Sequence, residues 1–216
     1  MPLNPLPRTL IALLLCLAFP AFAADRNPSA ELGLGLGLLA GGNGAGYGLG
    51  ASQRLGVDVP AGPIHSVVVA VEHAHHVLQD ATAYFPNDIV SPDALEGGRD
   101  RWALSLGARL QLQLADPAAD HLVVEPLAEV GMAFVASHTV LTLGGLDGAA
   151  RLGNWDGAPA FFVGMGADVR VRTFLALVPA LRVTIALQQD PPENGGQGLY
   201  GAEVRGDLSL SARVTF

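Results

Sequence analysis

Three histidines and a glutamate lie close together in the chain, in the order Glu72, His73, His75 and His76. Residues two apart on a strand share a face, so His73 and His75 could hold a metal ion such as Zn²⁺. A stable metal site needs more ligands than two imidazoles, and the sequence locates none of them. We therefore expect no metal and no other cofactor, and we interpret these histidines as polar residues at the end of a strand.

Ser137 and His138 form a second candidate group, because a serine beside a histidine base can act as a nucleophile. Glu125 or Asp147 could orient the histidine, but their spacing favours neither. A neighbouring serine and histidine close to a loop are usually ordinary loop residues. We therefore expect no catalytic residues, and we expect the protein not to be an enzyme.

The elements that would position these residues are strands, because apolar and polar residues alternate with a period of two. The clearest segment is 102–114, where Trp102 and Leu104 share one face while Arg109 and Gln111 share the other. Seven further segments show the same alternation: 31–40, 46–55, 67–76, 122–134, 161–172, 181–188 and 204–216. The sequence therefore predicts an all-β protein with eight strands.

The first 23 residues have a different character. Arg8 supplies a positive charge, 10–19 form an apolar run, and Ala21, Phe22 and Ala23 form a small-x-small cleavage site. The apolar run is too short to span a bilayer. We expect 1–23 to be a secretory signal peptide and 24–216 to be one β-barrel domain. The single cysteine, Cys16, lies in the signal peptide, so no disulfide is expected.

The charge balance excludes some partners. Arg8 is the only one of 12 basic residues within 1–23, and all 20 acidic residues follow it, so residues 24–216 carry a formal charge of −9. Such a chain is repelled by phosphate backbones, and we expect no nucleic-acid partner.

The hydrophobicity is that of a membrane protein, although the apolar residues do not form long runs. Half of the residues are hydrophobic and only 15% are charged, yet no segment of 24–216 is long enough for a membrane helix. If the first strand ascends, the connections 78–100, 137–157 and 189–201 lie at the outer end, and they are long. The connections 56–63, 116–120 and a turn near 173–175 lie at the inner end, and they are short. Long outer and short inner connections are typical of transmembrane β-barrels.

The placement of aromatic and charged residues agrees with an up-and-down transmembrane barrel. At the outer strand ends, four aromatic residues would form a girdle at the membrane interface, namely Tyr47, Trp102, Phe134 and Phe161. The polar faces carry seven arginines and seven acidic residues, and we expect them to pair in a lumen filled by side chains. The predicted lumen network is Arg109, Glu125, Glu129, Asp168, Arg170, Arg182, Arg205, Asp207 and Arg213. A soluble sandwich or lipocalin-like barrel also alternates, but its outside would have to be polar, and the glycine-rich faces of 31–40 and 46–55 suit that poorly.

The C-terminal segment 208–216 carries a more specific signal. Leu210, Ala212, Val214 and Phe216 alternate with polar residues and end on an aromatic. This pattern resembles the assembly signal of Gram-negative outer-membrane barrels, and the domain resembles the small eight-stranded barrels of the OmpA membrane domain, OmpX and OmpW. The resemblance implies insertion into the bacterial outer membrane by the barrel-assembly machinery. Outer-membrane lipid A deacylases have barrels of similar size and a His-x-Ser order, from which Ser137 and His138 depart.

We therefore expect a monomeric outer-membrane barrel without enzymatic activity, whose acidic outer loops make contacts at the cell surface. Outer-membrane lipids and lipopolysaccharide are the expected partners. Two alternatives stay open at this point. One is a barrel of the OmpW kind that passes small hydrophobic solutes, and the other is a lipid A-modifying esterase.

Overall fold

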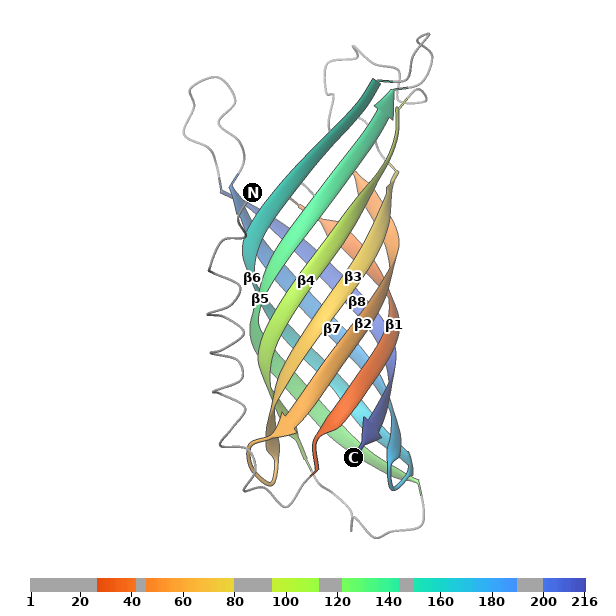
Figure 1. Ribbon diagram of the computed structural model, residues 1–216, viewed down its shortest axis with the longest axis vertical. Helices are drawn as coiled ribbons and strands as arrows, with labels where there is room; N and C mark the ends of the chain where they lie inside the picture. Colours follow the sequence, from red (N-terminus) through yellow and green to blue (C-terminus); the bar gives the residue numbers. More distant parts are fainter. Residues whose placement is uncertain (1–26, 42–45, 80–94, 113–121, 144–149, 190–199) are drawn as a thin grey trace, which may run out of the picture.

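The computed structural model describes residues 27–41, 46–79, 95–112, 122–143, 150–189 and 200–216, and these form a closed barrel (Figure 1). Each strand pairs antiparallel with the next, and the first pairs with the last. The all-β class and the eight-stranded up-and-down topology are thus confirmed. Among the described residues, no helix is long and apolar enough to cross a membrane. The strands are β1 (Ser29–Ala40), β2 (Tyr47–Pro60), β3 (His65–Leu78), β4 (Leu95–Gln111), β5 (Val123–Leu143), β6 (Ala150–Arg172), β7 (Leu175–Gln189) and β8 (Tyr200–Thr215). The predicted signal peptide lies outside the described residues.

Short turns lie at the end of the barrel where β1 begins and β8 ends (Figure 1). The strands β6 and β7 are joined by a turn at Thr173 and Phe174, within the region that the sequence indicated. The strands β2 and β3 are joined by residues 61–64, where the backbone N–H of Ala61 donates to the carbonyl of His65 at 2.9 Å. We call this the inner end and the opposite one the outer end, since inner turns of membrane barrels are short.

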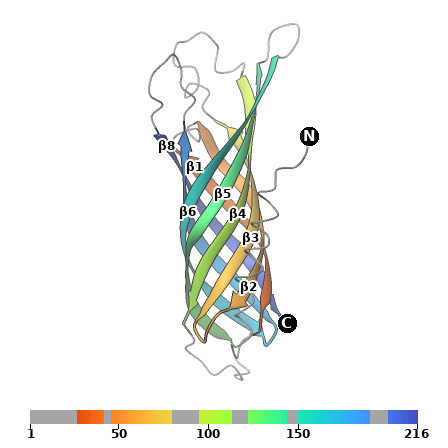
Figure 2. The ribbon, with the colours of Figure 1, turned by 60° about the vertical axis from the view of Figure 1, so that its left-hand side comes forward.

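At the outer end, β4, β5 and β6 are longer than the sequence indicated (Figure 2). The segment 137–157, predicted as a loop, is mostly paired strand, with Ser137 opposite Asp156 and Leu143 opposite Ala150. Likewise β4 begins at Leu95, within the predicted loop 78–100. A strand that extends beyond the apolar belt is in contact with water on both faces. It keeps its backbone pairing, but its sequence no longer alternates between apolar and polar residues, so the strand cannot be recognised from the sequence.

The barrel is apolar outside and charged inside. Leu34 is 69% exposed and Val163 is 57% exposed, whereas Arg109 is 2% exposed and Glu203 is fully buried. A soluble barrel or sandwich has the opposite arrangement, so this alternative is wrong. On β5 the exposed apolar side chains run from Val124 to Phe134, which is about 25 Å along the axis of a barrel with tilted strands. This is the height of the apolar band in outer-membrane barrels.

Candidate functional site

The centre of the inner half of the lumen is Arg109 of β4. Its guanidinium donates to Asp58 of β2 at 2.7 Å, to Glu129 of β5 at 3.0 Å, and through both terminal nitrogens to Glu31 of β1. All four side chains are buried. A planar guanidinium can hold several carboxylates at once because its five N–H groups spread like a fork. Arg109 thus ties four strands together across the interior.

A second arginine closes the inner end of the same cluster. Arg213 of β8 donates through Nε to Glu31 at 2.7 Å and through Nη1 to Asp168 and, at 3.2 Å, to Gln111. The Gln111 amide in turn donates to Glu125 at 2.7 Å and to Asp168 at 3.2 Å. Buried carboxylates therefore accept hydrogen bonds from several directions, which repays part of the cost of removing them from water.

The network continues towards the outer end through Glu129. Its Oε1 accepts from Arg54 at 2.8 Å and from Arg182 at 2.9 Å. Arg182 reaches Glu72 at 3.5 Å, and Glu72 also accepts from Arg205, which pairs with Asp207. The predicted lumen residues accordingly lie in one continuous set of contacts, with Arg170 joined to it through Glu125 at 3.4 Å.

Towards the outer end from this set lies a further cluster of charged side chains, which the sequence analysis missed. Arg99 and Arg101 are each 1% exposed and both contact Glu203, at 2.9 and 3.2 Å. Arg99 also donates to the hydroxyl of Thr139 at 2.9 Å. The predicted strand began at Trp102, which left both arginines outside it. Extending the odd-numbered polar positions of β4 from Arg109 backwards would have placed both in the lumen.

The space between the charged clusters is filled by packing. The Phe162 ring lies 3.6 Å from the guanidinium carbon of Arg182. A Cβ at Gly131 would lie 2.5 Å from Cα of Gly107 and 2.6 Å from the Phe162 ring, so glycine is what lets the ring enter the lumen. The cavity beside Gly33 is about 10 Å³, room for about one water molecule.

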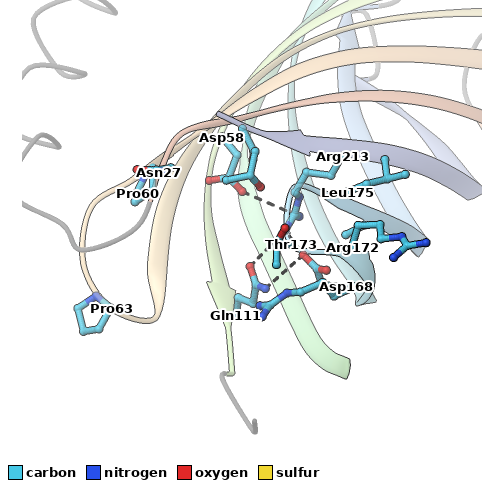
Figure 3. Close-up of a pocket in the computed structure, with 14 residues that line it drawn as sticks. Asn27, Asp58, Pro60, Pro63, Gln111, Asp168, Arg172, Thr173, Leu175 and Arg213 are labelled. Atoms are coloured by element: carbon cyan, nitrogen blue, oxygen red, sulfur yellow. Dashed lines mark hydrogen bonds and ion pairs between the residues drawn. The ribbon is translucent and has the colours of Figure 1, made fainter. Parts of the chain in front are cut away.

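A larger cavity of about 370 Å³ opens at the inner end (Figure 3). Asp58, Asp168, Gln111 and Arg213 lie at its base, where Gln111 donates to Asp168 and accepts from Arg213, and Arg213 lies 3.9 Å from Asp58 (Figure 3). Asp58 also binds Arg109, and Gln111 and Asp168 bind Arg213, so the cavity ends at the ion-pair network.

The candidate chemical residues are divided between the two faces of the wall. Glu72 and His76 point into the lumen, while His73 and His75 point outwards, so the four do not converge. Within the described segments, no group of three potential ligands is placed to hold a metal ion. Ser137 is fully buried on the inner side of β5. The next residue, His138, points outwards, lies opposite Asp100 and stacks on Trp155 at 4.5 Å. Ser137 and His138 therefore lie on opposite faces of the strand and cannot form a serine–histidine dyad.

The predicted girdle residues Trp102, Phe134 and Phe161 are exposed at 47%, 58% and 54%. Tyr47 is not part of the girdle, since it is only 4% exposed. A register shift between Tyr47 and Gly50 places Tyr47 opposite Leu78 and turns its ring inwards. In the C-terminal segment the predicted assembly residues lie on the outward side of the β8 end, namely Leu210, Ala212, Val214 and Phe216.

A further correction concerns charge on the outer surface, because the alternation put the charges of the predicted strands on their polar, inward faces. Asp100 lies on the outward side of β4, and its side chain is 40% exposed. It had been assigned to the loop 78–100, and the earlier start of β4 is the reason for the difference.

Comparison with known proteins adds to this geometry at the level of the fold. No protein-family model matches the sequence, and no curated protein matches it. Neisserial surface protein A shares 13% identity and a TM-score of 0.54, over 88% of this chain and 97% of that one. A major outer membrane protein from Thermus thermophilus shares 16% identity and a TM-score of 0.55, over 87% and 99%. OprG from Pseudomonas aeruginosa shares 8% identity and a TM-score of 0.50, over 89% and 98%. The chain has the fold of small outer-membrane barrels.

Proposed function

We propose that this barrel is a monomeric, non-enzymatic protein of the Gram-negative outer membrane, closed to solutes, which carries acidic segments at the cell surface. The observation that supports closure is the network around Arg109, Glu129 and Arg182. These side chains come from β4, β5 and β7, and their contacts to Glu72 of β3, four strands from β7, and to Glu31 of β1 span the lumen. A solute could pass only by separating several buried ion pairs, and each broken pair leaves an uncompensated charge.

The outer-membrane location is supported by three properties of the described strands. The exposed belt is apolar, aromatic residues lie near its outer margin, and the fold is that of outer-membrane barrels. The position of Phe216 at the end of the sheet agrees with recognition by the barrel-assembly machinery.

The surface role is supported by charge at the outer end. The segments 80–94, 144–149 and 190–199 together contain six acidic residues and no arginine or lysine. Arg99 and Arg101, which precede the predicted strand at Trp102, are buried in the lumen and add no positive charge to these segments. The outer segments therefore carry uncompensated negative charge, and we propose that they contact a cationic partner, while lipopolysaccharide, which is itself anionic, is contacted by other parts of the barrel.

The proposed absence of enzymatic activity is supported by the orientation of two neighbouring side chains on β5. Ser137 and His138 are neighbours on a strand and point to opposite faces, so the imidazole cannot take the proton of the hydroxyl. A lipid A esterase would need a different nucleophile.

Single-channel recording in planar bilayers tests closure. The purified protein should show no steady conductance, while an open porin reconstituted in the same way shows stepwise currents. Arg182→Ala, which removes a side chain from the middle of the lumen, should be compared with Leu181→Ala, which removes one from the lipid-facing surface. Long-lived openings in the unmodified protein would favour the solute-passing alternative. Membrane fractionation, with gel migration before and after heating, tests location and barrel formation separately.

A further inference from the structure

Outward-facing polar side chains gather at one place on the barrel. Away from strand ends, the described outward positions are apolar or glycine except for five residues on β2 to β5. We call them the outer polar patch: Gln53, His73, His75, Asp100 and His138. In the strand register, His75 is opposite Asp100 and Asp100 is opposite His138, while Gln53 is opposite His73. Two neighbouring cross-strand rows therefore contain the entire patch.

The patch is ordered by its own contacts. Oδ1 of Asp100 lies 2.9 Å from Nδ1 of His75 and 3.4 Å from Nε2 of His73. The amide nitrogen of Gln53 lies 3.3 Å from Nδ1 of His73. Asp100 contacts Nδ1 of His75, which leaves Nε2 of His75 to bind a third group, whereas both ring nitrogens of His73 already have partners within the patch.

Two tryptophans frame these polar groups. The His73 ring lies 4.3 Å from Trp102, and the His138 ring is stacked on Trp155 at 4.5 Å with an angle of 19°. Trp155 is 63% exposed. Indole faces offer apolar platforms with an N–H donor at one edge, which suits a ligand that is part ring and part polar.

The height of the patch determines what it meets. Trp102 and Phe134 mark the outer margin of the apolar belt, and Asp100 and His138 lie further out along the same strands, on the same face. Asp100 and His138 thus lie at the level of lipid headgroups, with His75 opposite Asp100, whereas Gln53 lies in the middle of β2. Polar side chains cost little at the headgroup level, but among the described outward positions away from strand ends they occur only on β2 to β5, which indicates a specific contact there.

We propose that the outer polar patch binds the phosphorylated disaccharide headgroup of lipid A in the outer leaflet. Imidazole and amide N–H groups donate to phosphate oxygens, Asp100 accepts from sugar hydroxyls, and the indole faces pack against sugar rings. Asp100 on β4 is the carboxylate that faces His73, His75 and His138 within the described strands, and Gln53 on β2 and Trp155 on β6 are neutral.

This inference rests on the proposed outer-membrane location, but its test is independent of closure and of fractionation. Binding is measured on the full barrel in detergent micelles by native mass spectrometry, with lipid A, monophosphoryl lipid A and phosphatidylglycerol as probes. The test variant is His75→Ala combined with His138→Ala. The matched control is His65→Ala, an exposed histidine at the inner end of β3.

We expect lipid A to bind roughly tenfold more weakly to the double variant, in keeping with the loss of charge-assisted hydrogen bonds. The His65→Ala barrel should bind lipid A like the unmodified one. Monophosphoryl lipid A should bind more weakly than lipid A, and phosphatidylglycerol should be indifferent to the substitutions. Equal lipid A affinity in all three barrels would overturn the proposal. A matching loss for phosphatidylglycerol would overturn it as well, since the patch would then be a general anion site. Heat-modifiable gel migration verifies that each variant is folded.

Discussion

Replacing Arg109 by glutamate should strongly destabilise the barrel. The arginine contacts three carboxylates, those of Glu31, Asp58 and Glu129, at hydrogen-bond distance. It is 2% exposed, so water cannot replace it. Arg109→Glu removes the cation that these carboxylates share and puts a fourth acidic group among them.

The size of the effect can be worked out from this geometry. Removing one partner from a buried ion pair costs about 3–5 kcal/mol. Two like charges 4 Å apart repel by about 4 kcal/mol at an effective dielectric constant of about 20. This sum is an upper limit, because one of the four carboxyl groups can take up a proton and become neutral. That protonation costs about 1.4 kcal/mol for each unit by which the pH exceeds the pKa of the group. We expect a loss of at least about 4 kcal/mol in the free energy of unfolding, which corresponds to roughly 10 °C in melting temperature.

Urea unfolding in phospholipid vesicles, followed by the fluorescence of the two tryptophans, measures this loss. The matched control is Arg170→Glu, at the inner rim, where the arginine side chain is 21% exposed and meets Glu125 at 3.4 Å. That substitution should cost about 1 kcal/mol or less, because water screens the rim. If Arg109→Glu and Arg170→Glu cost the same, the lumen is as wet as its rim, and the packed-network account is wrong.

The remaining predictions concern the wall, assembly and catalysis. Gly131→Ala should destabilise the barrel by about 1–3 kcal/mol in the same assay, because its Cβ would lie 2.3 Å from a backbone oxygen. Gly206→Ala should be neutral, because nothing lies within 4 Å of the Cβ it adds. Equal effects of the two substitutions would refute the close-approach argument. Deletion of Phe216 should lower the amount of folded barrel in outer-membrane fractions, and unchanged levels would contradict the assembly-signal interpretation. Lipid A and short-chain esters should stay intact when incubated with the protein, and hydrolysis that Ser137→Ala or His138→Ala abolishes would show that the opposite-face geometry does not hold in solution.

The strands were predictable wherever the two faces of the wall meet different surroundings. Between Trp102 and Gln111 one face contacts lipid and the other the lumen, so the alternation is strict and the sequence reveals the strand. Above Phe134 this contrast fades, and the nine further residues of β5, to Leu143, could not be told from a loop. The same fading hid Arg99 and Arg101, although their spacing continues that of the lumen positions below them.

The pairing inside the lumen was only partly accessible from sequence. Glu125 or Glu129 could be suggested as the partner of Arg109 because both lie on the following strand, and the register places Glu129 opposite Arg109. Glu31 and Asp58 could not, since they reach Arg109 across the lumen from β1 and β2. Contacts of this kind depend on barrel diameter and on side-chain length, which a period of two does not encode. The inward turn of Tyr47 depends on a single register shift, which leaves no trace in the alternation either.

The contact between Arg213 and Glu31 has a consequence for the order of assembly. The two residues are 182 positions apart, on the last and the first strand, and Arg109 shares the same glutamate. They meet only when β8 joins β1. Until that seam closes, Glu31 and Asp58 lack Arg213, one of their two cations, and must keep part of their hydration. The water around these two carboxylates therefore leaves only when the seam closes, and the stability that the Arg213 ion pairs contribute is gained in that step. An assembly factor that holds the seam open would keep a hydrated, weakly stabilised barrel, and release of the seam alone would suffice to lock it.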